Sequence, residues 1–228
     1  MLHSKNINIL LVADSAVPGA TNCPVTGKLV QCLRRHQPLS DDVLNLRFAV
    51  FNVPHLTSSP RLVHCFSSYF YQRLSVVGFK SVRNWPRKAN KLQLSSLESL
   101  FFPMHSTIDG YGHWTLGAVD FKRKTIVFYD PRQNVEETDP EPVFTNIRAY
   151  LAEEAAYNTT SPDLNLDDWT NSILATADKQ TNAFDCGVFV CAMAEYLMDG
   201  HDVPFTKKDM QLFRWKILHA ITSPQPLN

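Results

Sequence analysis

The stretch QTNAFDCGVFVCAMAEYLMDG, Gln180 to Gly200, decides how the rest of the sequence is interpreted. A polar segment ends at Asp185 and Cys186, and an almost unbroken apolar run follows. Such a run predicts a helix that is buried on most sides and stops at Gly200. Cys186 then lies in the first turn, where unpaired backbone N–H groups and the helix dipole stabilise a thiolate. This position favours a reactive cysteine over a structural one.

The clearest β signal is a predicted hairpin in the middle of the chain. HWTLGAVD and TIVFYDP are two β-rich runs around the polar turn FKRK. A turn centred on the FK of that segment places His113 opposite Asp130, and a shift of one residue makes Thr115 the partner of Asp130. In either register His113 and Asp130 share one face of the hairpin, because each face repeats every two residues.

Cys186, His113 and Asp130 are therefore candidates for a nucleophile, a base and the carboxylate that orients the base. Attack on a carbonyl also builds an oxyanion, which needs hydrogen-bond donors. The backbone N–H of Cys186 and the side-chain amide of Gln180 are candidates for that role. The set predicts acyl-transfer chemistry, and its spacing fits a protease and an acyltransferase equally.

Length and composition predict one catalytic domain. The chain has 228 residues, of which 44% are hydrophobic, which is enough to bury a sizeable core. No repeat or long linker is visible. We expect a catalytic domain at 37–222, an N-terminal extension of uncertain order at 1–36 and a flexible tail at 223–228.

Charge and cysteine usage bound the partners and the compartment. Lys+Arg and Asp+Glu both number 22, so there is no overall field to attract nucleic acid or an anionic membrane. The five cysteines are odd in number and scattered, which indicates reduced thiols. The run INILLVA is too short to span a membrane. We expect an intracellular monomer, in the nucleus or the cytoplasm, with no nucleic-acid or membrane partner.

The remaining histidines and cysteines do not form a recognisable site. Cys23, Cys32 and His36 lack the paired spacing of zinc ligands, and so does the pair His64 and Cys65. We therefore predict no metal and no cofactor. No GxSxG, P-loop or dinucleotide motif is present. His105 precedes the hairpin, would not face Asp130, and is interpreted as structural.

Several further helices are predicted around this centre. Ser40 is expected to cap a helix over SDDVLNLRFAVFN, with two aspartates in its first turn. Helices are also expected over VHCFSSYFYQRLSVV and VFTNIRAYLAEEAA. The last helix begins with a capping-box pattern at Thr206 and Asp209.

With GHWTLGAVDFKRKTIVFYDP and QTNAFDCGVFVC in place, the sequence resembles the SUMO-specific (ubiquitin-like-protein-specific, sentrin-specific) cysteine proteases over roughly 37–221. LSDDVLN resembles the WLND helix start of that family. The resemblance implies a papain-like α+β fold with a mixed sheet packed by helices. It also implies catalytic roles for His113, Asp130, Cys186 and Gln180, and cleavage after the C-terminal Gly-Gly of SUMO or a related modifier.

The resemblance further implies a narrow passage for the Gly-Gly tail, with Trp114 as one wall and Asp41 among the substrate-binding residues. Pro38 stands where the family has the tryptophan of the second wall, which predicts a looser clamp, with either lower efficiency or an altered preference among modifiers. Basic residues of the following connector are candidates for contacting an acidic face of the modifier, or form a solvated loop. These residues are Arg83, Arg87 and Lys88.

The leading hypothesis is a thiol isopeptidase or endopeptidase whose partners are SUMO, or a related modifier, and its conjugates. It would act on lysine conjugates, on modifier precursors, or on both. One alternative is deconjugation of ubiquitin or another modifier, which Pro38 keeps open. Two others are an acyltransferase with the same triad and a non-catalytic module that binds the modifier.

Overall fold

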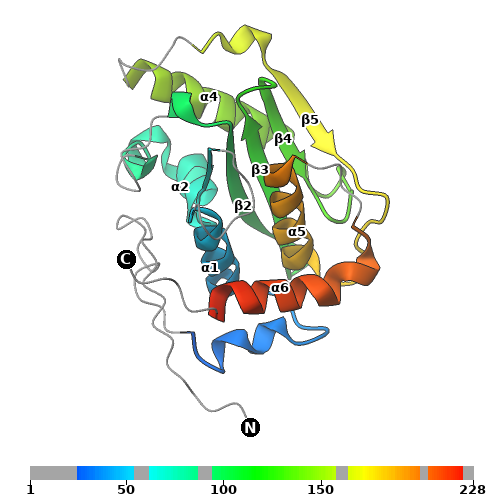
Figure 1. Ribbon diagram of the computed structural model, residues 1–228. Coiled ribbons are helices and arrows are strands. Elements are labelled where there is room, and N and C mark those ends of the chain that lie inside the picture. Colours follow the sequence, from blue (N-terminus) through cyan, green and yellow to red (C-terminus); the bar gives the residue numbers. More distant parts are fainter. Residues whose placement is uncertain (1–24, 54–61, 87–93, 158–163, 201–204, 223–228) are drawn as a thin grey trace.

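A computed structural model describes residues 25–53, 62–86, 94–157, 164–200 and 205–222 (Figure 1). Its helices, written α for α-helices and η for 3-10 helices, and its strands follow one another as η1 (Leu29–Leu33), α1 (Asp41–Phe51), β1 (Val63–Cys65), α2 (Tyr69–Val77), η3 (Phe79–Ser81), η4 (Leu94–Ser96), β2 (Ser99–Ile108), β3 (Tyr111–Asp120), β4 (Thr125–Tyr129), α4 (Glu141–Tyr157), η5 (Leu166–Asp168), β5 (Thr170–Leu174), α5 (Cys186–Asp199), η6 (Lys207–Asp209) and α6 (Met210–Thr222).

The strands form one mixed sheet in the order β1-β2-β3-β4-β5. β2, β3 and β4 are joined by two tight turns and pair antiparallel. β1 and β5 pair parallel with β2 and β4 at the two edges. The predicted α+β class with a mixed sheet packed by helices is confirmed.

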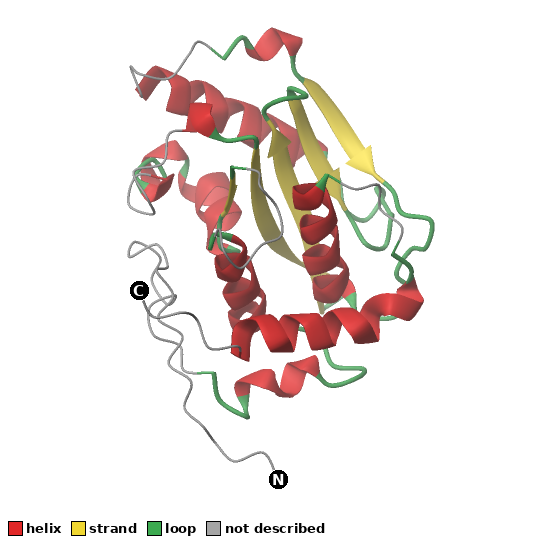
Figure 2. Ribbon diagram, in the orientation of Figure 1, coloured by secondary structure: helices red, strands yellow, loops and turns green. Residues whose placement is uncertain are grey.

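Helices cover both faces of the sheet (Figure 2). One buried cluster joins a face of the sheet to α1, α5 and α6, with Phe48, Phe189 and Phe213 among its members. A second cluster joins the other face to α2 and α4, with Phe70 and Tyr150 at its centre. The N-terminal end of α5 meets α6, and the segment before α1 lies on the far side of α6 (Figure 1).

The predicted helix ends are largely confirmed. The Ser40 side chain accepts a hydrogen bond from the Val43 N–H at 3.4 Å and caps α1. Both hydrogen bonds of the capping box between Thr206 and Asp209 are present. α5 ends at Gly200, whose φ of 70° is the left-handed conformation that favours glycine.

Two edge strands depart from the sequence-based prediction. Residues 63–65, predicted to start a helix, form β1, and the helix begins only at Tyr69. β5 (Thr170–Leu174) was not predicted. Both strands are short and pair parallel with strands that lie far away in the sequence, so local periodicity carried no signal for them.

The predicted division into an extension at 1–36, a catalytic domain at 37–222 and a tail at 223–228 stays a prediction. The first 24 residues and the tail 223–228 lie outside the described residues. From residue 25 the chain is described, and Leu33 of η1 is buried against α1 and α6. None of the helices in the described ranges has the length and apolar character needed to cross a membrane.

Candidate active site

His113 and Asp130 contact each other at one end of the sheet. Leu116 of β3 pairs with Tyr129 of β4, so the next residue, Asp130, lies opposite Thr115. This is the second of the two registers predicted from the sequence. His113 is two residues further along the same face. Its Nε2 lies 2.7 Å from Oδ1 of Asp130, and both side chains are buried. The predicted juxtaposition on the hairpin is present.

The Asp130 carboxylate is fixed by further hydrogen bonds. Its Oδ1 accepts the Arg132 N–H at 2.8 Å, and its Oδ2 accepts the Asn134 N–H at 3.4 Å and the Thr138 hydroxyl. Burial raises the pKa of Asp130, but the bonds from His113, Thr138 and Arg132 outweigh burial and hold that pKa below its usual range. Asp130 is therefore a carboxylate at neutral pH, oriented toward the imidazole.

Cys186 is the first residue of α5 and is only 1% exposed. Burial lowers the pKa of His113, but hydrogen bonding with Asp130 and Cys186, together with their charges, raises it to about 9. Since Nε2 contacts Asp130, the ring nitrogen left for Cys186 is Nδ1. The arrangement therefore favours a protonated imidazole at neutral pH, held between Asp130 and Cys186.

The other buried cysteines have a different environment. Burial raises the pKa of Cys191, which lies five residues further along α5, to about 12, and it also raises the pKa of Cys65. Both are therefore thiols at neutral pH, which is the behaviour expected of inert core residues. Of the described cysteines, Cys186 is the one that contacts His113.

Gln180 is held by two hydrogen bonds. Its backbone N–H donates to the Pro131 carbonyl at 2.7 Å, and its side-chain Nε2 donates to the Asn182 carbonyl. His113 and Gln180 both line a cavity of about 440 Å³, together with Arg132 and Asn182. An amide nitrogen carries two hydrogens, so Nε2 keeps one donor for a further acceptor.

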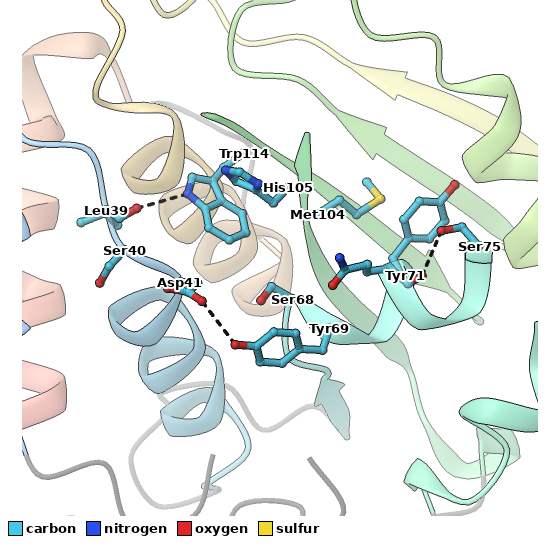
Figure 3. A pocket seen from close by; sticks show the side chains of 11 residues that line it. Leu39, Ser40, Asp41, Ser68, Tyr69, Tyr71, Ser75, Met104, His105 and Trp114 are labelled. Atoms are coloured by element: carbon cyan, nitrogen blue, oxygen red, sulfur yellow. Dashed lines mark hydrogen bonds between the residues drawn. The ribbon is translucent and has the colours of Figure 1, made fainter. Parts of the chain in front are cut away.

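Trp114 lies at one end of a second cavity of about 560 Å³, formed between α1, α2 and the β2–β3 pair (Figure 3). Its indole Nε1 donates to the Leu39 carbonyl at 3.3 Å. The His105 ring packs against it with centroids 4.5 Å apart. A Cβ on Gly187 would lie only 3.0 Å from Leu39 Cβ and 3.2 Å from Trp114 Cδ1, so α5 approaches both closely.

Of the predicted substrate-binding residues, Trp114 and Asp41 line the 560 Å³ cavity and Pro38 does not. Asp41 lines the 560 Å³ cavity and accepts a hydrogen bond from the Tyr69 hydroxyl at 3.2 Å. Pro38 is exposed and is not among the residues lining that cavity, whereas its neighbour Leu39 is. His105, interpreted from sequence as structural, is exposed and lines the cavity, on the same face as Trp114, with which it pairs.

Of the three basic residues predicted to contact the modifier, Arg83 lies within the described residues. The Arg83 guanidinium lies 5.4 Å from the centre of the Tyr157 ring, a cation–π contact. Arg87 and Lys88 lie outside the described residues. Within the part of the chain that the structure describes, no three His, Cys, Asp or Glu side chains form a group that could hold a metal ion.

Three contributors were missed in the sequence. Leu39 carried no signal because its role depends on packing against α5 and β3. Thr138 follows Asp130 by one loop, and an Asp with a hydroxyl residue eight positions later is too common a pattern to indicate a contact. Arg214, on the last helix, binds the residue before Cys186.

Comparison with known proteins places these residues in context. The model of the Ulp1 protease family, C-terminal catalytic domain, matches residues 37–223. Human (Homo sapiens) sentrin-specific protease 2 is 28% identical over 212 residues, covering 90% of this chain and 34% of that protein. Ubiquitin-like-specific protease 1 of Saccharomyces cerevisiae is 28% identical over 200 residues, covering 88% and 30%. The chain thus spans about a third of the length of these relatives.

Solved structures agree with the sequence matches. The C-terminal Ulp1 protease domain in complex with Smt3, the yeast ortholog of SUMO, superposes with a TM-score of 0.74 at 28% identity. That match covers 89% of this chain and 85% of the other. A second Ulp1 structure, with its catalytic cysteine oxidised to a sulfenic acid, superposes with a TM-score of 0.75 at the same identity and coverage.

Proposed function

The chain belongs to the Ulp1 protease family, and we propose that it is a cysteine peptidase that cleaves after the C-terminal Gly-Gly of SUMO. It releases the modifier from lysine conjugates or from a precursor tail. The observation that carries the proposal is the contact of His113 with both Asp130 and Cys186, at the N-terminus of α5. The modifier is suggested by the related Ulp1 domain that was solved with Smt3.

The proposed reaction has two halves. Sγ of Cys186 attacks the carbonyl carbon of the terminal glycine, and the carbonyl oxygen becomes an oxyanion. As this intermediate collapses, the C–N bond breaks and protonated His113 gives its proton to the leaving amine. Neutral His113 then takes a proton from water, whose oxygen attacks the thioester. The C–S bond breaks, the Cys186 thiolate is restored, and the modifier leaves with a free carboxylate.

Two donors are proposed for the oxyanion. The backbone N–H of Cys186 is at the N-terminus of α5, where the first amides of a helix have no partner within the helix. The free N–H of the Gln180 amide is the second. Preplaced donors of this kind stabilise the charge that develops during attack, in a site from which water is excluded.

Replacing Gln180 with alanine should lower kcat by about 10²- to 10³-fold, the usual cost of losing one oxyanion donor, and leave KM within about 2-fold. Gln180→Glu should be equally impaired, because a carboxylate has no hydrogen to donate. Steady-state cleavage of a fluorogenic modifier substrate measures both constants. Gln211→Ala on α6 is the control, and an unchanged kcat in Gln180→Ala would remove this residue from the mechanism.

The two cavities are proposed to take opposite sides of the scissile bond. The modifier tail would reach Cys186 past Trp114, from the 560 Å³ cavity lined by Asp41 and His105. The close packing of Trp114 and Leu39 on α5 leaves little width there, which favours residues without side chains. The leaving lysine, or the precursor tail, would occupy the 440 Å³ cavity beside His113.

Activity should follow the protonation of His113. Its pKa of about 9 predicts that kcat/KM falls as the pH rises through about 9, because the imidazolium is lost. Asp130→Asn removes the carboxylate that raises this pKa, so the alkaline decline should move to lower pH, toward the usual value of 6.5. At pH 7.5 its kcat should be lower by about 10³- to 10⁴-fold. Profiles of kcat/KM from pH 5 to 10 for both proteins measure the shift.

The His113–Asp130 pair also makes the stability of the folded protein depend on pH. A histidine whose pKa is raised in the folded state contributes stability that is complete below about 6.5 and is lost as the pH rises through about 9. Thermal unfolding should therefore show a stability difference between wild type and Asp130→Asn that shrinks across this window. A difference that is constant from pH 6 to 10 would contradict the assigned ion pair.

The substrate is tested with modifiers that carry a thiol-reactive electrophile in place of the C-terminal carboxylate. SUMO and ubiquitin probes are incubated separately with the protein, and the modified peptide is identified by mass spectrometry. An adduct of SUMO at Cys186, and none of ubiquitin, is the expected result. An adduct of ubiquitin alone would keep the chemistry and replace the substrate, an outcome that the exposed Pro38 makes worth testing. The absence of both adducts would overturn the proposal.

A further inference from the structure

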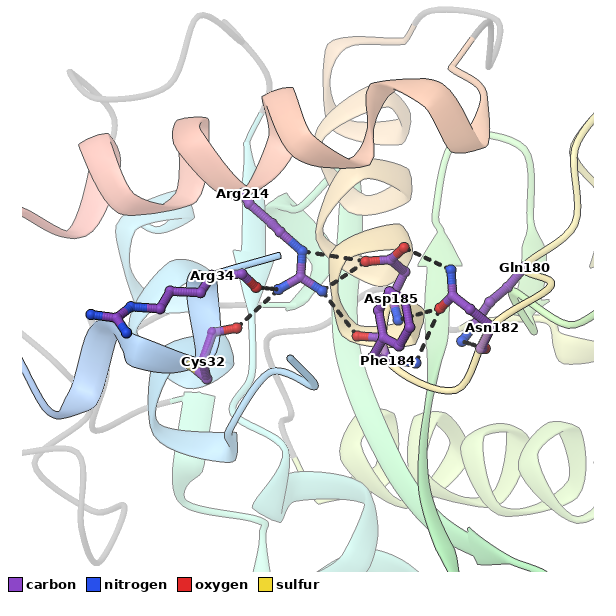
Figure 4. A network of polar contacts seen from close by, with 7 residues as sticks. All are labelled: Cys32, Arg34, Gln180, Asn182, Phe184, Asp185 and Arg214. Atoms are coloured by element: carbon purple, nitrogen blue, oxygen red, sulfur yellow. Dashed lines mark hydrogen bonds and ion pairs between the residues drawn. The ribbon is translucent and has the colours of Figure 1, made fainter. Parts of the chain in front are cut away.

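Arg214 of α6 is a buried cation, 2% exposed, that contacts two other segments of the chain (Figure 4). Its Nη2 and Nε lie 2.7 and 3.3 Å from Oδ1 of Asp185, and Nη2 also donates to the Phe184 carbonyl at 3.1 Å. Its Nη1 donates to the carbonyls of Cys32 and Arg34, at 2.9 and 3.1 Å. A guanidinium has five N–H donors, and these five bonds use them all.

These contacts reach the proposed oxyanion donors. Asp185 precedes Cys186, and its Oδ2 accepts a hydrogen bond from the Asn182 side chain at 2.9 Å. The Asn182 Oδ1 accepts the N–H groups of Phe184 and Asp185 and so folds the loop into a turn. The Asn182 carbonyl accepts the Gln180 amide. Continuous hydrogen bonds thus join Arg214 to the loop 180–185 that carries Gln180 and leads into Cys186.

The other side of the network is residues 29–36, which we call the upstream segment. It lies before residue 37, where the match to the family model begins. Besides the two carbonyls bound by Arg214, Leu33 is buried in the core cluster of α1 and α6. The His36 ring packs against the Phe184 ring, with centroids 5.0 Å apart. This segment therefore contacts the loop that precedes Cys186 directly as well as through Arg214.

We propose that Arg214 is a positioning residue: it ties the upstream segment and α6 to the loop 180–185, and so holds Cys186 and Gln180 in their reactive arrangement. The inference rests on the proposed function and extends it to residues outside the family match. A displacement of about 1 Å in a reacting group is enough to lower a rate by about 100-fold.

Arg214 also neutralises the charge of a neighbouring carboxylate. The Asp185 carboxylate is adjacent to Cys186, where an unbalanced negative charge opposes formation of a thiolate. The ion pair between Asp185 and Arg214 balances that charge with a cation whose position is fixed by three other hydrogen bonds. A neutral residue at position 214 would leave the carboxylate buried without its cation.

The test separates positioning from stability by counting reactive sites. Arg214→Met removes the charge, Arg214→Lys keeps it without the five-donor geometry, and Asp185→Asn combined with Arg214→Met removes both charges. Active sites are titrated with the electrophilic modifier probe that reacts with wild type, so that kcat refers only to competent molecules. Thermal unfolding of each variant is measured alongside.

For Arg214→Met we expect kcat per titrated site to fall by about 10- to 100-fold. KM should stay within about 2-fold, because neither Arg214 nor the loop 180–185 lines the 560 Å³ cavity proposed for the modifier tail. Asp185→Asn should recover part of the loss in the double variant, and Arg214→Lys should retain part of kcat. A role confined to folding would lower the number of titrated sites and the unfolding temperature while leaving kcat per site unchanged. That result overturns the proposal.

A matched pair tests the upstream segment in the full chain. His36→Ala removes the contact with Phe184 and should lower kcat per site, whereas Arg35→Ala, at an exposed neighbouring position, should not. Equal values for the two would exclude the segment from the positioning network.

Failure of the proposed function is distinguished by a measurement without any modifier. The rate at which iodoacetamide alkylates Cys186 is followed by mass spectrometry in wild type and in Arg214→Met. A wild type that cleaves no modifier refutes the peptidase function alone. The inference about Arg214 is supported if alkylation is slower by about 10-fold in the variant and is refuted if the two rates agree.

Discussion

Replacing Cys186 with alanine should abolish turnover, with kcat reduced on the order of 10⁶-fold, the loss seen when a peptidase loses its nucleophile. The physical reason is that, of the described cysteines, Cys186 is the one whose side chain interacts with His113. Cys186 begins α5 and hydrogen-bonds with an imidazole whose pKa is raised to about 9. The measurement is single-turnover cleavage of a modifier conjugate, with wild type and variant at equal concentration.

Cys191→Ala is the matched control for this experiment. Cys191 belongs to the same helix and is equally buried, but burial raises its pKa to about 12 and keeps it protonated. Its removal should cost some stability by leaving a small cavity and should leave kcat per folded molecule unchanged. Turnover that survives in Cys186→Ala, or is lost in Cys191→Ala without unfolding, would show that the nucleophile has been assigned to the wrong cysteine.

His113→Ala should lower kcat by a similar amount, on the order of 10⁶-fold, because base and nucleophile act as one unit. The imidazole stabilises the thiolate, protonates the leaving amine and activates the water, so its loss affects both half-reactions. Effects within such a unit are not additive. A variant with both His113→Ala and Cys186→Ala should therefore be no slower than either single variant, which rapid-quench assays with excess enzyme can establish.

His219→Ala, an exposed position in the last turn of α6, is the control for the histidine. It should match wild type in both kcat and pH profile. Multiplicative losses in the double variant would mean that His113 and Cys186 act independently, and the proposed mechanism would then be wrong. Retention of most activity in His113→Ala would point to another base, with His105 as the next residue to test.

The part of the site that sequence could predict is the part built from local patterns. The β3–β4 hairpin is continuous in sequence, and period-two alternation puts His113 and Asp130 on one face in either register. The register itself was left open, because a four-residue polar turn allows both centres. Cys186 was recognisable because the change from polar to apolar residues marks the start of α5.

Features that depend on distant segments were not predictable. β1 and β5 obtain their strand structure from parallel partners, so β1 was predicted as helix and β5 was missed. Nothing local indicates that Arg214 binds the carbonyl of Cys32, 182 residues earlier. The exposure of Pro38 and the inward position of Leu39 also depend on how α1 packs against α5 and β3.

The arrangement of the sheet has a consequence for the order in which the molecule folds. β2, β3 and β4 are consecutive in the chain and pair through short turns, so their contacts close small loops and are expected to form early. α5 comes from much further along the chain and must dock onto this meander afterwards. His113 and Asp130 can therefore meet before Cys186 reaches them. A nascent or partly unfolded chain then holds Cys186 apart from His113 and Asp130, and the proposed active site is complete only once α5 has docked onto the sheet.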